Sequence, residues 1–186
     1  MVRLTGFLIG ALISALIFTA PATADWPFGT PATLGEIAER LAERHQRIEH
    51  ISTIELAAMR RTNERFILLD VREASEFDVS YIPGAIRVDP GAGADDIRGL
   101  LIGTDPNVPI VVYCAVGTRA SRLGTRLTRD LDGHPIMNVR GGIFAWHNEN
   151  RPLENETGAT ELIHPYSQSR VKLLNRSELA SRQAAL

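Results

Sequence analysis

The sequence predicts an α/β protein with a central, mainly parallel sheet of five strands flanked by helices. Short apolar runs alternate along the chain with segments in which apolar residues recur at helical spacing. The connections between the apolar runs are too long for hairpins, which favours parallel pairing. Two of these runs end at chemically active residues, Asp70 and Cys114, and ligands bind at the carboxyl ends of parallel strands.

The composition is that of an ordinary soluble globular protein. The 186 residues carry a net charge of -2, and 44% of them are hydrophobic, which is enough for one well-buried domain. The basic residues, nearly all arginine, are interleaved with acidic ones, a pattern typical of solvated helix faces, so we expect no nucleic-acid partner. The single cysteine excludes an internal disulfide and any multi-cysteine metal site.

Residues 1–24 have the pattern of a signal peptide. Arg3 precedes an apolar stretch, "FLIGALISALIF" (7–18), and "ATA" (22–24) fits a cleavage site after Ala24. The stretch is short for a membrane span, which needs about 20 residues, although an uncleaved N-terminal anchor is the alternative. We expect a cleaved, exported, periplasmic protein with no membrane attachment. An unpaired thiol is unusual in such an oxidising compartment, which suggests that Cys114 is kept for chemistry.

The mature chain begins with a predicted helix, an edge strand and a second helix. Residues 25–46 comprise an irregular lead-in and then a helix over 33–46, in which apolar residues share one side. Residues 47–52 alternate in polarity and predict a short edge strand. Ser52 followed by Glu55 is a capping-box signature, which predicts that a short helix begins there.

Four further strands are predicted to alternate with helices. The strands are expected over 65–73, 85–90, 108–114 and 135–142, and the first and third are apolar enough to be buried on both faces. The helices are expected over 73–85, 94–103, 119–133 and 142–150. After Pro152 the sequence turns polar. This tail, 153–186, has too little apolar surface for a second core, with room for a short helix around 169–184.

The loop after the strand at 108–114 holds the candidate reactive residues, which are Cys114, Ala115, Val116, Gly117, Thr118 and Arg119. A small, glycine-containing loop between a strand and a helix aims several backbone N–H groups at one point, on the positive end of the helix dipole. These donors favour the thiolate form of a cysteine and would hold an incoming anion, with Arg119 as a fixed positive charge. An inert, buried strand-end cysteine is the alternative, and the residues alone favour neither.

Three segments resemble the rhodanese-type sulfurtransferases, in the order of that family. "CAVGTRAS" (114–121) resembles the family's active-site loop, C-x-x-G-x-R-[SA]. "DVREASEFDVSYIPGAI" (70–86) resembles its D-V-R-x-x-x-E-[FY]-x-x-G-H-I-P-G-A signature, with Ser80-Tyr81 in place of the usual Gly-His. "VRGGIFAW" (139–146) resembles the V-x-G-G-x-x-x-W segment that closes the domain. Together with the strand and helix before them, these segments indicate a rhodanese-like domain over 47–152.

The resemblance implies a sulfurtransferase that needs no metal or organic cofactor. Cys114 would take the outer sulfur of a donor such as thiosulfate as a persulfide, held by the amides from Ala115 to Arg119. It would pass this sulfur to cyanide, to a thiol or to a protein acceptor. Arg119 would orient the donor's sulfonate, and Thr118 would offer a hydroxyl.

The loop length separates two related chemistries. Four residues lie between Cys114 and Arg119, whereas phosphatases of related fold resemble C-x5-R, whose wider loop accommodates phosphate. The shorter loop favours sulfur transfer. A non-catalytic or sulfur-carrier binding module is the alternative function, and a phosphatase-like enzyme is a distant third.

The remaining motif residues are expected to be structural. Asp70 and Arg72 resemble the family's buried pair, which ties a strand end to neighbouring loops. Gly141 and Gly142 allow a tight turn from strand to helix, and Trp146 is expected in the core. The five histidines have no metal-binding spacing and are expected at surface or capping positions; they are His45, His50, His134, His147 and His164.

Overall fold

The computed structural model describes residues 33–131 and 133–184. These residues belong to one unit of the chain. The predicted signal peptide 1–24, its cleavage site after Ala24 and the lead-in at 25–32 lie outside the described residues. No helix in the described part of the chain is both long and apolar enough to cross a membrane.

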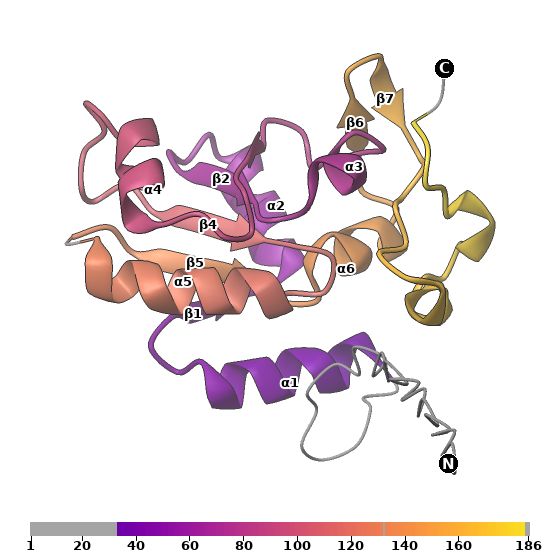
Figure 1. Cartoon of the computed structure of the whole chain (residues 1–186), viewed down its shortest axis with the longest axis horizontal. Coiled ribbons are helices and arrows are strands. Elements are labelled where there is room, and N and C mark those ends of the chain that lie inside the picture. The colour runs from indigo at the N-terminus through magenta and orange to yellow at the C-terminus, as the bar shows by residue number, and fades with distance from the viewer. Residues whose placement is uncertain (1–32, 132, 185–186) are drawn as a thin grey trace, which may run out of the picture. The chain divides into compact units, whose positions relative to one another are not determined.

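Five parallel strands form the central sheet, which confirms the predicted fold class (Figure 1). The strands are β1 (Glu49–Ile51), β2 (Ile67–Asp70), β3 (Ile86–Arg87), β4 (Ile110–Tyr113) and β5 (Ile136–Val139). Their order across the sheet is β1-β5-β4-β2-β3, and each neighbouring pair is parallel. The strand expected at the edge, β1, lies at the edge.

Six α-helices accompany these strands within the described residues. They are α1 (Leu34–Arg44), α2 (Thr53–Arg61), α3 (Ala74–Phe77), α4 (Ala94–Leu100), α5 (Thr118–Asp130) and α6 (Gly142–Asn148). Helices α4 and α5 contact each other on the near face of the sheet in Figure 1, and α2 and α6 contact each other beyond it. The predicted capping box of Ser52 and Glu55 opens α2, because each side chain accepts a hydrogen bond from the backbone N–H of the other residue.

The hydrophobic core fixes the two elements, β4 and α5, that flank the loop at residues 114–117, here called the reactive loop. Strand β4 lies in the middle of the sheet and all four of its residues are buried. Leu123 and Leu127 of α5 pack onto it and are at most 1% exposed. Burial of a leucine contributes about 1.5–3 kcal/mol, so the end of β4 and the start of α5 are firmly positioned. Trp146 is also buried, as expected, and its Nε1 donates to the carbonyl of Pro152.

The segment after Pro152 consists of several short elements. It forms an antiparallel hairpin, β6 (Leu153–Asn155) and β7 (Gly158–Thr160), followed by the short 3-10 helices η1 (Gln168–Leu173) and η2 (Ser177–Leu179) in place of one helix around 169–184. The backbone of Glu154 exchanges two hydrogen bonds with that of Tyr81. Ile163 is fully buried and pairs with Ala180.

The tail extends the first core, which is why its sparse apolar residues suffice. Leu153, Ile163, Leu173 and Leu174 are all buried, although they have no helical or strand periodicity. Asn148, at the end of α6, donates from Nδ2 to the carbonyl of Leu173 and accepts from the N–H of Asn175. These contacts bring the residues between β7 and η1 beside the loop that follows β4 (Figure 1).

Candidate active site

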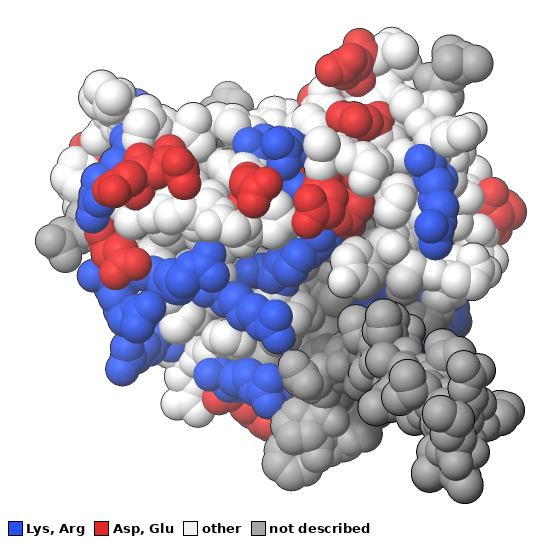
Figure 2. Space-filling model, viewed as in Figure 1, with Lys and Arg blue, Asp and Glu red and all other residues white. Residues whose placement is uncertain are grey.

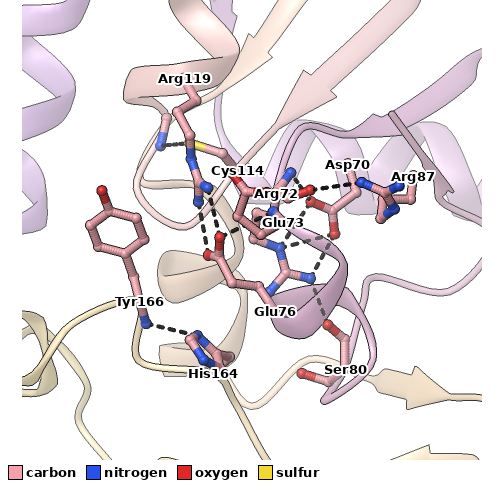
Figure 3. Close-up of polar contacts among 11 residues, drawn as sticks. Asp70, Arg72, Glu73, Glu76, Ser80, Arg87, Cys114, Arg119, His164 and Tyr166 are labelled. Carbon is pink, nitrogen blue, oxygen red and sulfur yellow. Dashed lines mark hydrogen bonds and ion pairs between the residues drawn. The ribbon is translucent and has the colours of Figure 1, made fainter. Parts of the chain in front are cut away.

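Cys114 lies at the junction of β4 and α5, where the sequence places it. Cys114 is 1% exposed, and its Sγ accepts a hydrogen bond of 3.2 Å from the backbone N–H of Gly117. Gly117 is the N-cap of the 13-residue helix α5 and has a φ of 96°, in the left-handed region that favours glycine. This conformation turns the chain so that the N–H points at the sulfur, at the positive end of the helix (Figure 3).

The other loop residues surround the sulfur of Cys114, and the site that they form is here called the cradle. Ala115 and Val116 are buried, and Ala115 directs its carbonyl away to accept from the N–H of Phe144. The Oγ1 of Thr118 is buried and has no hydrogen-bond partner among the described residues. An unpaired buried hydroxyl is costly, so Thr118 is a ready donor to an anion in the loop.

A second turn, between β5 and α6, supports the loop from behind. Gly141 and Gly142 both have left-handed backbones, with φ values of 70° and 57°. The turn they make lets the N–H of Ile143 donate to the carbonyl of Cys114 at 2.9 Å. A Cβ on Gly142 would come within 2.2 Å of that same carbonyl oxygen, so only glycine permits this approach.

Arg119 is paired with a residue that the sequence reasoning did not single out. Its Nη1 and Nη2 donate to the two carboxylate oxygens of Glu76 at 2.6 Å and 2.8 Å (Figure 3). Glu76 is the glutamate of the D-V-R-x-x-x-E signature, so the motif contained the signal that identifies it. The pair fixes the arginine beside the thiol.

Electrostatics keep both members of this pair charged. Burial alone would raise the pKa of Glu76, but the hydrogen bonds and charge of Arg119 outweigh it and lower that pKa. Burial would likewise lower the pKa of Arg119, yet Glu76 and the neighbouring Cys114 raise it above its ordinary value. The cradle therefore holds a permanent cation next to the sulfur.

Tyr166 of the C-terminal segment lies on the guanidinium of Arg119, and sequence reasoning missed this contact. Its ring centroid is 4.9 Å from Cζ of Arg119, a cation–π distance (Figure 3). The residue has a φ of 61°, which is uncommon for a non-glycine residue, and its N–H donates to Nδ1 of His164 at 3.0 Å. Nothing in the tail's composition signals that it reaches the site.

Two histidines are buried rather than on the surface, which corrects the sequence expectation. His147 is 1% exposed and its Nε2 lies 3.1 Å from the carbonyl of Glu161. His164 is 8% exposed and lies beside Glu76 and Arg119. Burial lowers the pKa of each histidine. His164 belongs to the C-terminal segment, and His147 contacts the same segment through the carbonyl of Glu161.

Asp70 and Arg72 form a fully buried ion pair. Nη2 of Arg72 is 2.6 Å from Oδ2 of Asp70 and 2.6 Å from the carbonyl of Ser80, so the pair ties the end of β2 to the turn after α3. Burial opposes the charge of Arg72, but Asp70 overcomes it and raises the pKa of the arginine. Neither residue has a described contact with Cys114.

Of the two residues that depart from the family signature, Tyr81 makes a side-chain packing contact and Ser80 does not. Tyr81 stacks on Phe77 with ring centroids 4.1 Å apart, whereas Ser80 binds Arg72 only through its backbone carbonyl, and its buried Oγ has no hydrogen-bond partner among the described residues. The backbone of Tyr81 is also the partner of β6. The departure therefore lies at the point where the tail joins the domain.

No group of three or more metal-ligating side chains occurs within the described ranges 33–131 and 133–184.

Comparisons with known proteins agree with this architecture. The family model of the Rhodanese-like domain matches residues 52–149. The "Putative sulfurtransferase YtwF" of Bacillus subtilis is 32% identical over 105 residues, which cover 56% of this chain and 96% of that protein. The "Adenylyltransferase and sulfurtransferase UBA4" of Meyerozyma guilliermondii is 31% identical over 93 residues, which cover 47% of this chain and 21% of that protein. This chain thus matches only about a fifth of the length of UBA4.

Solved structures share the fold. A thiosulfate sulfurtransferase from Pseudomonas aeruginosa superposes with a TM-score of 0.52 at 22% identity, over 75% of this chain and 26% of that one. The BH2092 protein from Bacillus halodurans superposes with a TM-score of 0.51 at 22% identity, over 67% of this chain and 88% of that one. At such identities the likeness establishes the arrangement of strands and helices.

Proposed function

Since the chain belongs to the rhodanese-like domain family, we propose that it is a sulfurtransferase that carries sulfane sulfur as a persulfide on Cys114. The observation that carries the proposal is the position of Sγ, 3.2 Å from the N–H of Gly117 at the start of α5, with Arg119 fixed beside it. Backbone N–H donors at a helix N-terminus and a nearby cation stabilise both a thiolate and the anions that react with it.

The proposed reaction has two covalent steps. The Cys114 thiolate attacks the outer sulfur of thiosulfate, the sulfur–sulfur bond of the donor breaks, and sulfite leaves with the bonding electrons. Cyanide or a thiolate then attacks the terminal sulfur of the persulfide. The bond between the two persulfide sulfurs breaks, Cys114 returns as the thiolate, and the product is thiocyanate or a new persulfide.

The residues around Cys114 have separate roles in these steps. The N–H groups from Ala115 to Arg119 stabilise negative charge on the sulfur, and Arg119 attracts the sulfonate of the donor. Thr118 donates its free hydroxyl to the bound anion. Glu76 positions Arg119 without touching the donor.

A sulfur-carrier role is the second candidate, and one observation favours it. The thiol is almost fully buried, and Tyr166 rests on the arginine that would receive a free anion. A carrier of this kind would exchange sulfur with a docked partner and turn over slowly with small donors. Export is part of the proposal on the strength of the sequence at 1–24, which supports a periplasmic site of action.

Mass spectrometry of the protein after thiosulfate treatment tests the proposal. We expect the wild type to gain one sulfur atom, to lose it to cyanide as one equivalent of thiocyanate, and Cys114→Ser to gain none. Steady turnover with thiosulfate would support the enzyme, and a single loading without turnover would support the carrier. If no donor loads Cys114, or if the protein instead hydrolyses an aryl phosphate, the proposal is wrong.

A further inference from the structure

The arginines of α5 lie along one side of the helix. Arg119, Arg122, Arg126 and Arg129 are spaced by three, four and three residues, which places them on one helical face, while Ala120, Ser121, Leu123, Gly124 and Leu127 are buried. These four arginines are here called the arginine row. Figure 2 shows basic side chains gathered over α5, with acidic side chains over α3 and α4. The sequence suggested arginines interleaved with acids, yet α5 has no acidic residue before Asp130.

Arg119 is paired with Glu76, but the three outer arginines of the row have no ion-pair partner among the described residues. Arg122 and Arg129 are exposed and form no ion pair with any residue in the described part of the chain. Arg126 donates only to a carbonyl, that of Ala92. Like charges three or four residues apart destabilise a helix, so the sequence of α5 retains the row at a cost to its own stability.

The end of α1 approaches the arginine row through His45. His45, at the end of α1, lies 2.9 Å from the hydroxyl of Thr125 on α5. Burial lowers its pKa, and the charges of His50, Arg44 and Arg122 lower it further. Arg44 of α1 and Arg122 of α5 therefore both lie near this histidine.

The row leads to the reactive sulfur at one end and stops at acidic residues at the other. Arg119, its first member, lies beside Cys114. Its last member, Arg129, borders a shallow hollow whose lining includes Asp95, Asp96 and Asp130. At a rise of 1.5 Å per residue the row is about 15 Å long, which about five residues of an extended peptide would span.

A ligand that uses the whole row must be longer than a small anion. A donor the size of thiosulfate bound at Cys114 reaches Arg119 alone, so the outer three arginines contribute nothing to it by contact. A nucleic acid would need a longer basic surface than one that ends at the carboxylates of α4. A short acidic segment next to a thiol fits both the length and the position of the row.

We propose that the arginine row is the docking surface for an acidic peptide segment that flanks the cysteine of a protein sulfur acceptor. The acidic residues lie within about five residues of that cysteine, so that they reach the row while the cysteine meets Cys114. In the transfer, the acceptor thiolate attacks the terminal sulfur of the Cys114 persulfide, the persulfide bond breaks, and Cys114 leaves as the thiolate. This inference rests on the proposed function and adds the class of acceptor.

The test compares sulfur transfer to two synthetic peptides at low ionic strength. Each has one cysteine, followed in one peptide by a run of glutamates and in the other by a run of lysines. We expect the loaded wild type to transfer sulfur to the glutamate peptide at least about tenfold faster, and salt to reduce the difference. The preference should disappear in Arg122→Glu/Arg129→Glu and persist in the matched control Arg61→Glu/Arg65→Glu, whose arginines are exposed elsewhere on the domain.

Two further measurements separate the possible failures. Dithiothreitol, which has no charge to dock, should discharge all three proteins at the same rate. Equal rates with the two peptides in the wild type, or a preference that survives Arg122→Glu/Arg129→Glu, would overturn the docking surface and leave the proposed function intact.

Failure to load Cys114 at all would overturn the proposed function. In that case, fluorescence anisotropy of the glutamate peptide with its cysteine alkylated tests the docking surface without sulfur transfer. Loss of binding in Arg122→Glu/Arg129→Glu supports the docking surface, and unchanged binding overturns it. Tighter binding of a single-stranded DNA oligonucleotide than of this peptide would assign the row to nucleic acid and overturn the proposal.

Discussion

Arg119 is held against Glu76 by two parallel hydrogen bonds of 2.6 Å and 2.8 Å, although 43 residues separate them in the chain. A bidentate pair fixes both the position and the plane of the guanidinium. The cation beside Cys114 is therefore oriented before any donor arrives, and its geometry depends on a carboxylate that the reacting sulfur does not touch.

Replacing Glu76 with glutamine should loosen Arg119 without removing it. We expect persulfide formation with thiosulfate to slow by about tenfold, because a displaced positioning group costs rate in this range. The melting temperature should fall by about 3–6 °C, since the pair is mostly shielded from water. Rapid-mixing mass spectrometry and thermal unfolding measure the two effects. Glu73→Gln, an exposed residue one turn away, is the control, and equal rates in the two variants would contradict the role of Glu76.

Gly142→Ala should disrupt the reactive loop more than a strained turn alone would. The new Cβ would lie 2.2 Å from the carbonyl oxygen of Cys114, and the φ of 57° is unfavourable for alanine. Gly103→Ala is the matched control, because Gly103 has a φ of 78° and open space around it.

The control should lose about 1 kcal/mol, seen as a fall of about 2–4 °C in melting temperature. Gly142→Ala should lose at least twice as much and form the persulfide more than about tenfold more slowly. Equal losses in the two variants would show that the loop tolerates the added methyl group.

Tyr166 should restrict access to the thiol through its contact with Arg119. A cation–π contact at an exposed site contributes about 0.5–1 kcal/mol, so Tyr166→Ala should lower the melting temperature by about 1–4 °C. We also expect iodoacetamide to alkylate Cys114 several times faster in Tyr166→Ala. Tyr166→Phe keeps the ring and should behave as the wild type. If all three proteins are alkylated at one rate, the tail does not guard the site.

Acid should destabilise the fold through its buried histidines. Burial lowers the pKa of His147 and His164 below the ordinary 6.5, so the folded state favours their neutral forms. Their contribution is present above pH 6.5 and is lost as the pH falls through the lowered values, because the unfolded chain binds those protons more readily. The melting temperature should therefore be lower at about pH 5 than at about pH 7.5.

Two substitutions isolate this effect. His164→Asn preserves an acceptor for the N–H of Tyr166, and His147→Gln preserves a donor to the carbonyl of Glu161. The double variant should lose less stability between these two pH values than the wild type, and His134→Asn should not. An unchanged pH dependence in the double variant would assign the acid sensitivity to other groups.

Much of the fold was predictable because its elements depend on local patterns. The capping box at Ser52, the apolar run of β4 and the spacing of Leu123 and Leu127 are each visible within a few residues. The reactive loop was predictable for the same reason, since Cys114 and Gly117 belong to one strand–loop–helix unit.

The contacts that complete the site were not predictable because they join distant residues. Glu76 and Tyr166 reach Arg119 from segments on either side of it in the sequence, and no periodicity connects them. The tail was expected to have too little apolar surface for a second core, and its place relative to the domain was left open. Ile163 shows how the tail packs without a second core: a single side chain that enters an existing core needs no core of its own.

The turn at Gly142 also makes the loop after β4 depend on residues that follow it in the chain. The N–H groups of Ile143 and Phe144, which bind the carbonyls of Cys114 and Ala115, are synthesised after the loop that they support. A chain cut short before this turn retains its cysteine but not the geometry that would make it a sulfur carrier.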